Sequence, residues 1–188
     1  MPVLAALLLT AGQAASPSPA AAAPASPPPT PGATCQSAPY RQFDFWIGEW
    51  QVTNQRPPAG RTPPPAKSRI TRILHGCAIL EEYETTAGHG YAGKSLNLYD
   101  SNSQKWHQVW IDTGGTPLFL EGGLQGRSMV LMDVRKSQAS GITWSQRITW
   151  TPLSGGTVRQ HWEKSKDDGA TWETVFDGLY RPRAGGAR

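Results

Sequence analysis

The sequence lacks long apolar runs and any sustained helical period, and these absences narrow its class. The longest apolar run, Val3 to Leu9, is far shorter than the about 20 residues that a membrane-spanning helix needs. No segment repeats apolar residues every three to four positions over several turns. We therefore expect a chain that does not span the membrane and is not built from helices.

Sequence motifs of the common enzyme classes are also missing. The chain has no Gly-x-Ser-x-Gly, no phosphate-binding loop and no dinucleotide-binding fingerprint. Its four histidines form neither a His-x-His nor a His-x-x-x-His pair, and such pairs are typical of zinc sites. The sequence thus predicts no metal site and no required cofactor.

The excess of positive charge is small and scattered. Of the residues behind the formal net charge of +4, Arg181, Arg183 and Arg188 lie at the C-terminal end. The other Lys and Arg residues are dispersed among acids, without the run or stripe that binds phosphate backbones. Nucleic acid is therefore not an expected partner.

The N-terminus has the pattern of a sorting signal followed by a spacer. Residues 1–15 combine a short apolar core with small residues, as in a secretory signal peptide. Residues 16–34 are nearly all Ala, Pro, Ser and Thr, which predicts a disordered tether. We expect one domain over 35–182, a disordered tail over 183–188, and export to the periplasm or beyond the cell. The alternative is an Ala-rich N-terminus of a cytosolic protein.

Cysteine is scarce, since Cys35 and Cys77 are the only two. In an exported chain two cysteines most simply form one disulfide. A bridge that closes a loop of about 40 residues would stabilise the fold by about 3 to 4 kcal/mol in the chain-entropy model. We therefore predict a Cys35–Cys77 disulfide.

After Trp50 the chain alternates between runs rich in Val, Ile, Leu, Tyr, Trp and Thr and short clusters of Gly, Pro, Asp, Asn and Ser. This pattern is typical of antiparallel strands joined by tight loops. The expected strands are 48–54, 67–75, 77–86, 91–99, 105–113, 117–124, 128–135, 142–150, 157–165 and 171–181. About ten sequential strands without a helical crossover would leave two open edges as a flat sheet. We therefore expect an all-β fold, an antiparallel up-and-down barrel.

One hairpin carries a recognisable motif over residues 165–172, with the sequence SKDDGATW. It resembles the Asp-box hairpin of sialidase-type propellers, in which Asp accepts backbone N–H groups and Trp packs beneath the turn. A propeller would repeat the motif in every blade, whereas this chain contains it once. We interpret the segment as a lock on a single hairpin.

Four further segments carry a resemblance to a whole family. They are FDFWIGEW at 43–50, SLNLYD at 95–100, KWHQVWID at 105–112 and VRQHWE at 158–163. Together they resemble a bacterial secreted family known mainly as a domain of unknown function. The similarity extends over nearly all of 35–181, and the family brings no established activity.

The step Gly48-Glu49-Trp50 is also similar to the start of lipocalin-like, or calycin, barrels. Those barrels begin with a Gly-x-Trp strand and often pack a basic residue of the last strand on that Trp. The resemblance implies a structural role for Gly48 and Trp50, with Arg181 against the indole. The number of strands and the lack of a C-terminal helix favour the ten-stranded relatives.

Strand alternation places a set of aromatic and amide side chains on the inward face. Such a set suits a pocket for a small hydrophobic or aromatic ligand, with area for burial and a few polar groups for orientation. The alternative is a filled core. The candidate ligand-binding residues are Asn97, Gln108, Trp110, Trp144, Gln160, Trp162, Phe176 and Tyr180.

The opposite face suggests an enzyme as the competing hypothesis. His161 and Glu163 could act as an acid-base pair, with Arg147 and Arg159 as an anion clamp, if that face lines the lumen. Some ten-stranded calycin barrels bind haem through one histidine, which would be His161 or His107 here. Without either chemistry, these strand residues belong to a solvated outer face.

Overall fold

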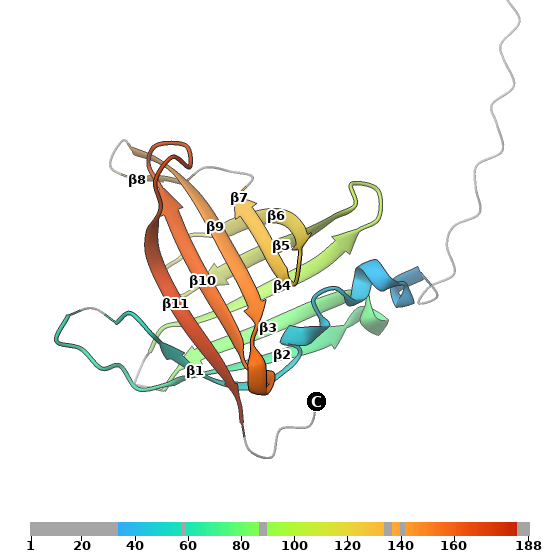
Figure 1. The fold of residues 1–188 in the computed structure, drawn as a ribbon, viewed down its shortest axis with the longest axis horizontal. Coiled ribbons are helices and arrows are strands. Elements are labelled where there is room, and N and C mark those ends of the chain that lie inside the picture. The colour runs from blue at the N-terminus through green and yellow to red at the C-terminus, as the bar shows by residue number, and fades with distance from the viewer. Residues whose placement is uncertain (1–33, 58, 87–89, 134–136, 140–141, 184–188) are drawn as a thin grey trace, which may run out of the picture.

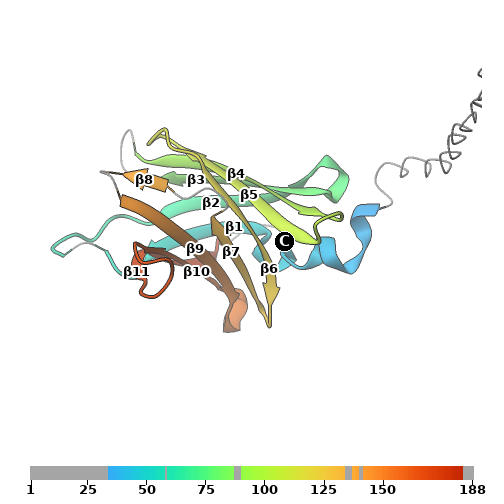
Figure 2. The ribbon, with the colours of Figure 1, turned by 90° about the horizontal axis from the view of Figure 1, so that it is seen from above.

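The protein is a closed antiparallel barrel with one end plugged by its own N-terminal segment (Figures 1 and 2). The computed structural model describes residues 34–57, 59–86, 90–133, 137–139 and 142–183. Within these ranges no helix is long and apolar enough to cross a membrane. The expected signal segment 1–15, residues 16–33 of the expected tether and residues 184–188 of the expected tail lie outside the described residues.

Ten strands form the barrel wall, as the alternation predicts. The wall strands are β1 (Gly48–Asn54), β2 (Ala66–Ile73), β3 (Ala78–Thr85), β4 (Ala92–Asp100), β5 (Lys105–Asp112), β6 (Leu118–Gln125), β7 (Ser128–Asp133), β9 (Ile142–Pro152), β10 (Val158–Ser165) and β11 (Glu173–Pro182). Each wall strand pairs with the wall strand that follows it in the chain, and the pairings of β9 with β10 and of β11 with β1 close the barrel. An eleventh strand, β8 (Ser137–Ala139), pairs only with the start of β9. The sequence prediction missed this strand, because 3 residues are too few to show a detectable alternation.

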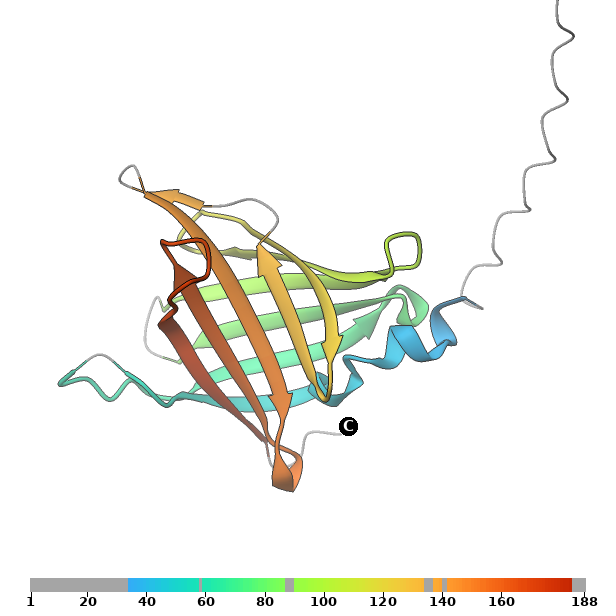
Figure 3. The same cartoon turned by 45° about the horizontal axis from the view of Figure 1, so that its top comes forward.

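Three short 3-10 segments lie at one end of the barrel, and the last of them closes it. These are η1 (Thr34–Gln36), η2 (Ala38–Arg41) and η3 (Asp44–Trp46), drawn in blue in Figure 3. Phe43 stacks on Trp46 at 4.9 Å between ring centroids and meets Trp150 edge-on at 5.2 Å. The indole N–H of Trp106 donates to Gln42 Oε1. This buried aromatic cluster fills the lumen at the end where β1 begins and β9 ends.

The predicted disulfide between Cys35 and Cys77 is confirmed. Its Cα atoms lie 4.9 Å apart, and it joins η1 to the turn η4 (Leu74–Gly76), which connects β2 to β3. The N-terminal plug is thus tied covalently to the rim of the barrel.

The Gly-x-Trp step starts β1 where the chain leaves the plug. Gly48 has a φ of +149°, which L side chains rarely adopt, and the indole of buried Trp50 donates to the Trp46 carbonyl. The predicted packing of Arg181 on Trp50 is wrong. Arg181 lies opposite Gln51 on the outer face and donates to Thr53 Oγ1. The cause is alternation, because Tyr180 takes the inward position of β11.

The Asp-box segment forms a hairpin lock between β10 and β11. Asp167 Oδ1 accepts the backbone N–H of Thr171, and Ser165 Oγ accepts that of Gly169. Hydrogen bonds from the Thr171 hydroxyl, the Thr171 backbone N–H and the Ser165 hydroxyl hold the pKa of the Asp167 carboxyl down at about 2. The Trp172 ring lies 4.2 Å from the Arg147 guanidinium carbon, so the indole covers the outer face of β9.

A β-bulge separates Trp172 from the inward residues of β11. Trp162 pairs with Phe176 but its neighbour Glu163 pairs with Thr174, so Val175 is the extra residue. Strict alternation predicts that Trp172 shares a face with Phe176 and Tyr180, and this is wrong. The bulge shifts the pattern by one residue, which turns Trp172 outward.

Candidate functional site

A cavity of about 340 Å³ occupies the lumen at the end opposite the plug. Its walls come from the ends of β3 and β5, the start of β6, the middle of β9 and β10, and both halves of β11. It is lined by Glu81, Tyr83, Tyr91, Gln108, Trp110, Leu118, Ile148, Gln160, Trp162, Val175, Phe176 and Tyr180. The volume is within the range of small-molecule pockets.

Hydrogen bonds fix the aromatic rings of the cavity mouth in place. Asp112 Oδ2 accepts the Tyr91 hydroxyl at 2.6 Å and the Trp110 indole N–H at 2.7 Å. The indole N–H of Trp162 donates to Gln146 Oε1 at 2.9 Å. Tyr83 meets Trp110 edge-on, with 6.3 Å between centroids. Because these polar groups are already paired, the rings present mainly apolar surface to the cavity.

Two glycines leave room for large rings close against the barrel wall. A Cβ on Gly93 would lie 2.2 Å from the Trp110 ring, and a Cβ on Gly178 would lie 2.3 Å from the Phe176 ring. Both rings therefore rest directly on the backbone of a neighbouring residue. Any side chain at these glycines would push the ring into the cavity.

A buried polar network forms the floor of the cavity. Gln108 donates to Asn97 Oδ1 at 2.8 Å, and Asn97 donates to Ser95 Oγ at 2.9 Å and to the Ile79 carbonyl. Glu81 lies at the centre of the network and is 2% exposed. It accepts hydrogen bonds from Ser68 at 3.0 Å and Ser95 at 3.1 Å.

The Glu81 carboxyl and the Tyr180 hydroxyl connect the floor to the far wall. Tyr180 Oη lies 3.4 Å from Glu81 Oε1 and makes a shorter hydrogen bond to Gln160 Oε1. Burial raises the pKa of Glu81 to about 7, and the hydrogen bonds from Ser68, Ser95 and Tyr180 offset only part of that rise. The cavity therefore contains a carboxyl that changes charge near neutral pH.

Most of the predicted ligand-binding residues are brought together at this cavity. Gln108, Trp110, Gln160, Trp162, Phe176 and Tyr180 line it. Asn97 and Trp144 do not. Asn97 is fully buried beneath Gln108, and the half-buried Trp144 ring lies 4.3 Å from Lys164 Nζ.

Sequence reasoning missed Glu81, Tyr83 and Tyr91 as cavity residues. In the sequence Glu81 stands next to Glu82, and two adjacent acids suggest a solvated surface. In the structure only Glu82 has such a position, where it pairs with Lys94. The parity of Ile79 and Tyr83, which share a face with Glu81, is the signal that could have found it. Tyr91 directly precedes β4 in the structure, but it opens the expected strand 91–99 with the parity of Asn97, and that parity is the signal that could have found it.

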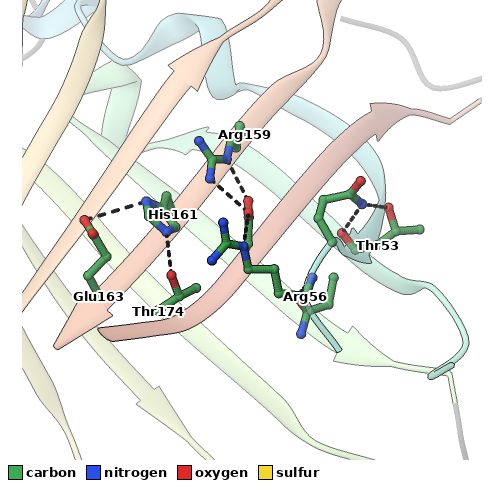
Figure 4. Close-up of polar contacts among 9 residues, drawn as sticks. Thr53, Arg56, Arg159, His161, Glu163 and Thr174 are labelled. Carbon is green, nitrogen blue, oxygen red and sulfur yellow. Dashed lines mark hydrogen bonds and ion pairs between the residues drawn. The ribbon is translucent and has the colours of Figure 1, made fainter. Parts of the chain in front are cut away.

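The residues of the enzyme hypothesis lie on the outer face of the barrel, opposite Gln160 and Trp162 (Figure 4). Figure 4 shows the His161 ring between Glu163 and Thr174, with Nδ1 3.6 Å from Glu163 Oε2 and Nε2 3.1 Å from Thr174 Oγ1. Glu163 also accepts two hydrogen bonds from Arg147, the shorter at 2.9 Å. The condition that this face lines the lumen is not met.

A second ion pair continues the outer cluster. Asp177, which the sequence did not single out, is buried and accepts two hydrogen bonds from Arg159, the shorter at 2.7 Å. Arg56 approaches the same carboxylate at 3.8 Å. Burial lowers the pKa of His161, and the nearby Arg159 adds to that effect against the opposing charge of Glu163. The charges of this cluster therefore satisfy one another.

The histidines that the structure describes do not fit a haem in the lumen. His161 and His107 point outward, where His107 lies 3.3 Å from Ser103 Oγ, and His75 is exposed on the rim. His89 lies outside the described residues. Over the described ranges, no three His, Cys, Asp or Glu side chains are grouped as metal ligands.

Comparison with known proteins finds no family model that matches the chain and no matching curated protein.

Proposed function

We propose that this barrel binds a small hydrophobic or aromatic molecule in its lumen. The observation that supports the proposal is the cavity of about 340 Å³ with aromatic walls and a polar floor. The hydroxyl of Tyr91 and the indole N–H groups of Trp110 and Trp162 in these walls are already hydrogen-bonded. Apolar area supplies most of the binding free energy in such pockets, and a few fixed polar groups orient the ligand. Because the rings are already held, little side-chain entropy is lost on binding.

We also propose that the chain is exported and related to the secreted family with the FDFWIGEW segment. The Cys35–Cys77 disulfide supports export, since such bonds persist in oxidising compartments. Acid-base catalysis by His161 and Glu163 has less support. Both side chains lie outside the cavity and are engaged with Thr174 and Arg147.

Tryptophan fluorescence titration tests the binding proposal directly. A small library of apolar aromatic molecules should include members that change the indole emission in a saturable way, because Trp110 and Trp162 line the cavity. Trp162→Ala removes contact area and should weaken binding by about 1 to 3 kcal/mol, with some loss of stability.

His161→Ala is the matched control, since it alters the same strand on the outer face. It should leave binding nearly unchanged. The opposite order of effects would support the enzyme hypothesis, and the absence of saturable binding by any library member would show that the lumen is only a packed core.

A further inference from the structure

Among the described residues that line the cavity, Glu81 alone carries a charged side chain. No Lys, Arg or His of the described ranges acts on it as a counter-charge, and only hydroxyl groups hydrogen-bond to it. A buried carboxylate without a cation is costly, because desolvation is not repaid by a partner. A bound ligand could supply the positive charge that the site lacks.

The hydrogen bonds of Glu81 leave room for such a ligand. Ser68 donates to Oε1 and Ser95 to Oε2. The Tyr180 hydroxyl oxygen lies closer to Gln160 Oε1 than to Glu81 Oε1, and its single proton cannot serve both acceptors. A carboxylate offers about four lone-pair positions. The Glu81 carboxylate can therefore accept further hydrogen bonds where it borders the cavity.

Aromatic rings form much of the wall of the same cavity. Tyr83, Tyr91, Trp110, Trp162 and Phe176 all line it together with Glu81. The faces of such rings attract cations through their quadrupole, most strongly when water is excluded. An aromatic wall around one carboxylate is complementary to a cationic head attached to an apolar body.

Building on the proposed binding function, we infer that the lumen selects organic amines, with the protonated amine against Glu81 and an apolar or aromatic body among the rings. The ammonium donates to the free positions of the carboxylate and compensates its buried charge. A buried carboxyl without a cationic partner is expected to have a raised pKa, as Glu81 has. A carboxylate ligand would be repelled.

Three probes of matched shape test the charge preference by calorimetry: phenethylamine, phenethyl alcohol and hydrocinnamate. At about pH 8 we expect wild type to bind the amine about tenfold more tightly than the alcohol and the acid most weakly. In Glu81→Gln the preference for the amine over the alcohol should nearly vanish while the alcohol still binds. Glu82→Gln, which removes an exposed carboxylate one residue away on the outer face, should keep the preference.

The preference should also depend on pH in a defined direction. It should grow from about pH 5.5 to 8 as Glu81 ionises, while the amine stays protonated, since alkylammonium groups titrate near 10. The other titratable groups that face Glu81 are Tyr83 and Tyr180, whose pKa values are raised by burial. Burial raises the pKa of Asp112 behind the mouth, but the hydrogen bonds from Tyr91, Trp110 and the backbone of Gly114 and Gly115 together lower it below its ordinary value. The charges of Tyr83, Tyr180 and Asp112 therefore stay constant between about pH 5.5 and 8.

Proton release provides a test that needs no variant. Near pH 7 the bound amine should expel a proton from about half of the Glu81 carboxyls, and calorimetry in buffers of different ionisation enthalpy measures it. The alcohol should release none. Alcohol binding without a preference for the amine, or an amine preference that survives in Glu81→Gln, would overturn the inference alone. If no probe binds and the apolar library also fails, the proposed binding function fails with it.

Discussion

At the scale of single residues, Glu81 is the position where stability conflicts with the proposed binding function. Its carboxyl is held by two serines in a wall that otherwise buries apolar and amide groups. A site that only had to fold would place a neutral side chain there, because a buried ionisable group without a counter-charge lowers stability. The hydroxyls around Glu81 reduce this cost but do not remove it.

The Glu81→Gln variant should be more stable than wild type at neutral pH. The folded-state pKa of about 7 lies above the ordinary value of 4.5, so the folded protein holds the proton longer than the unfolded chain. The contribution of Glu81 to stability is therefore fully present below about pH 4.5 and is lost as the pH rises to about 7. Over that window wild type should lose roughly 2 to 3 kcal/mol relative to the variant.

Urea denaturation of both proteins at several pH values measures this difference. The two stability curves should diverge between pH 4.5 and 7 and run parallel above that range. Parallel curves over the whole range would mean that Glu81 is not desolvated in the folded protein.

At the scale of elements, β4 and β5 show how backbone and ring geometry shape the cavity. Trp110 on β5 lies across Gly93 of β4, and Asp112 holds its indole N–H. The ring can neither rotate outward nor sink into the wall. The position of the cavity mouth is therefore set by the pairing of these two strands.

Gly93→Ala should narrow the cavity and weaken ligand binding. The new methyl group would lie 2.2 Å from the Trp110 ring, so the ring must shift into the lumen, at a cost of about 1 to 3 kcal/mol in stability. We expect roughly tenfold weaker binding of an apolar aromatic probe in the fluorescence titration. Gly123→Ala on β6 is the control, since nothing lies within 4 Å of its Cβ position. Equal effects of both changes would refute the steric argument.

At the scale of the whole molecule, the N-terminal plug and the barrel act as one unit. The plug contributes Phe43 and Trp46 to the core, and the disulfide connects it to the turn between β2 and β3. Its packing fills one end of the lumen, and the cavity lies toward the opposite end.

Loss of the disulfide should lower the free energy of unfolding without abolishing the fold. The bridge has a sequence separation of 42, and the chain-entropy model attributes about 3 to 4 kcal/mol to a loop of that size. The double variant Cys35→Ser, Cys77→Ser should show this loss in urea denaturation. Intact mass of protein recovered from the periplasm should reveal no free thiols and cleavage near residue 15. Two free thiols on an uncleaved chain would contradict the export proposal.

The sequence by itself determined the barrel class, the ten wall strands and the disulfide. Strand alternation and turn residues are local signals, and they also placed Trp162 and Gln160 on the lumen side. Only the tertiary structure decided which inward residues surround empty space. Asn97 and Trp144 have the correct parity but lie beneath or beside the cavity, because parity determines the face of a strand and not the depth along the barrel. The bulge at Val175 turned Trp172 outward, since one extra residue reverses parity beyond it. The burial of Glu81 was also decided by the tertiary structure, since Ser68, Ser95 and Tyr180 on three other strands surround its carboxyl.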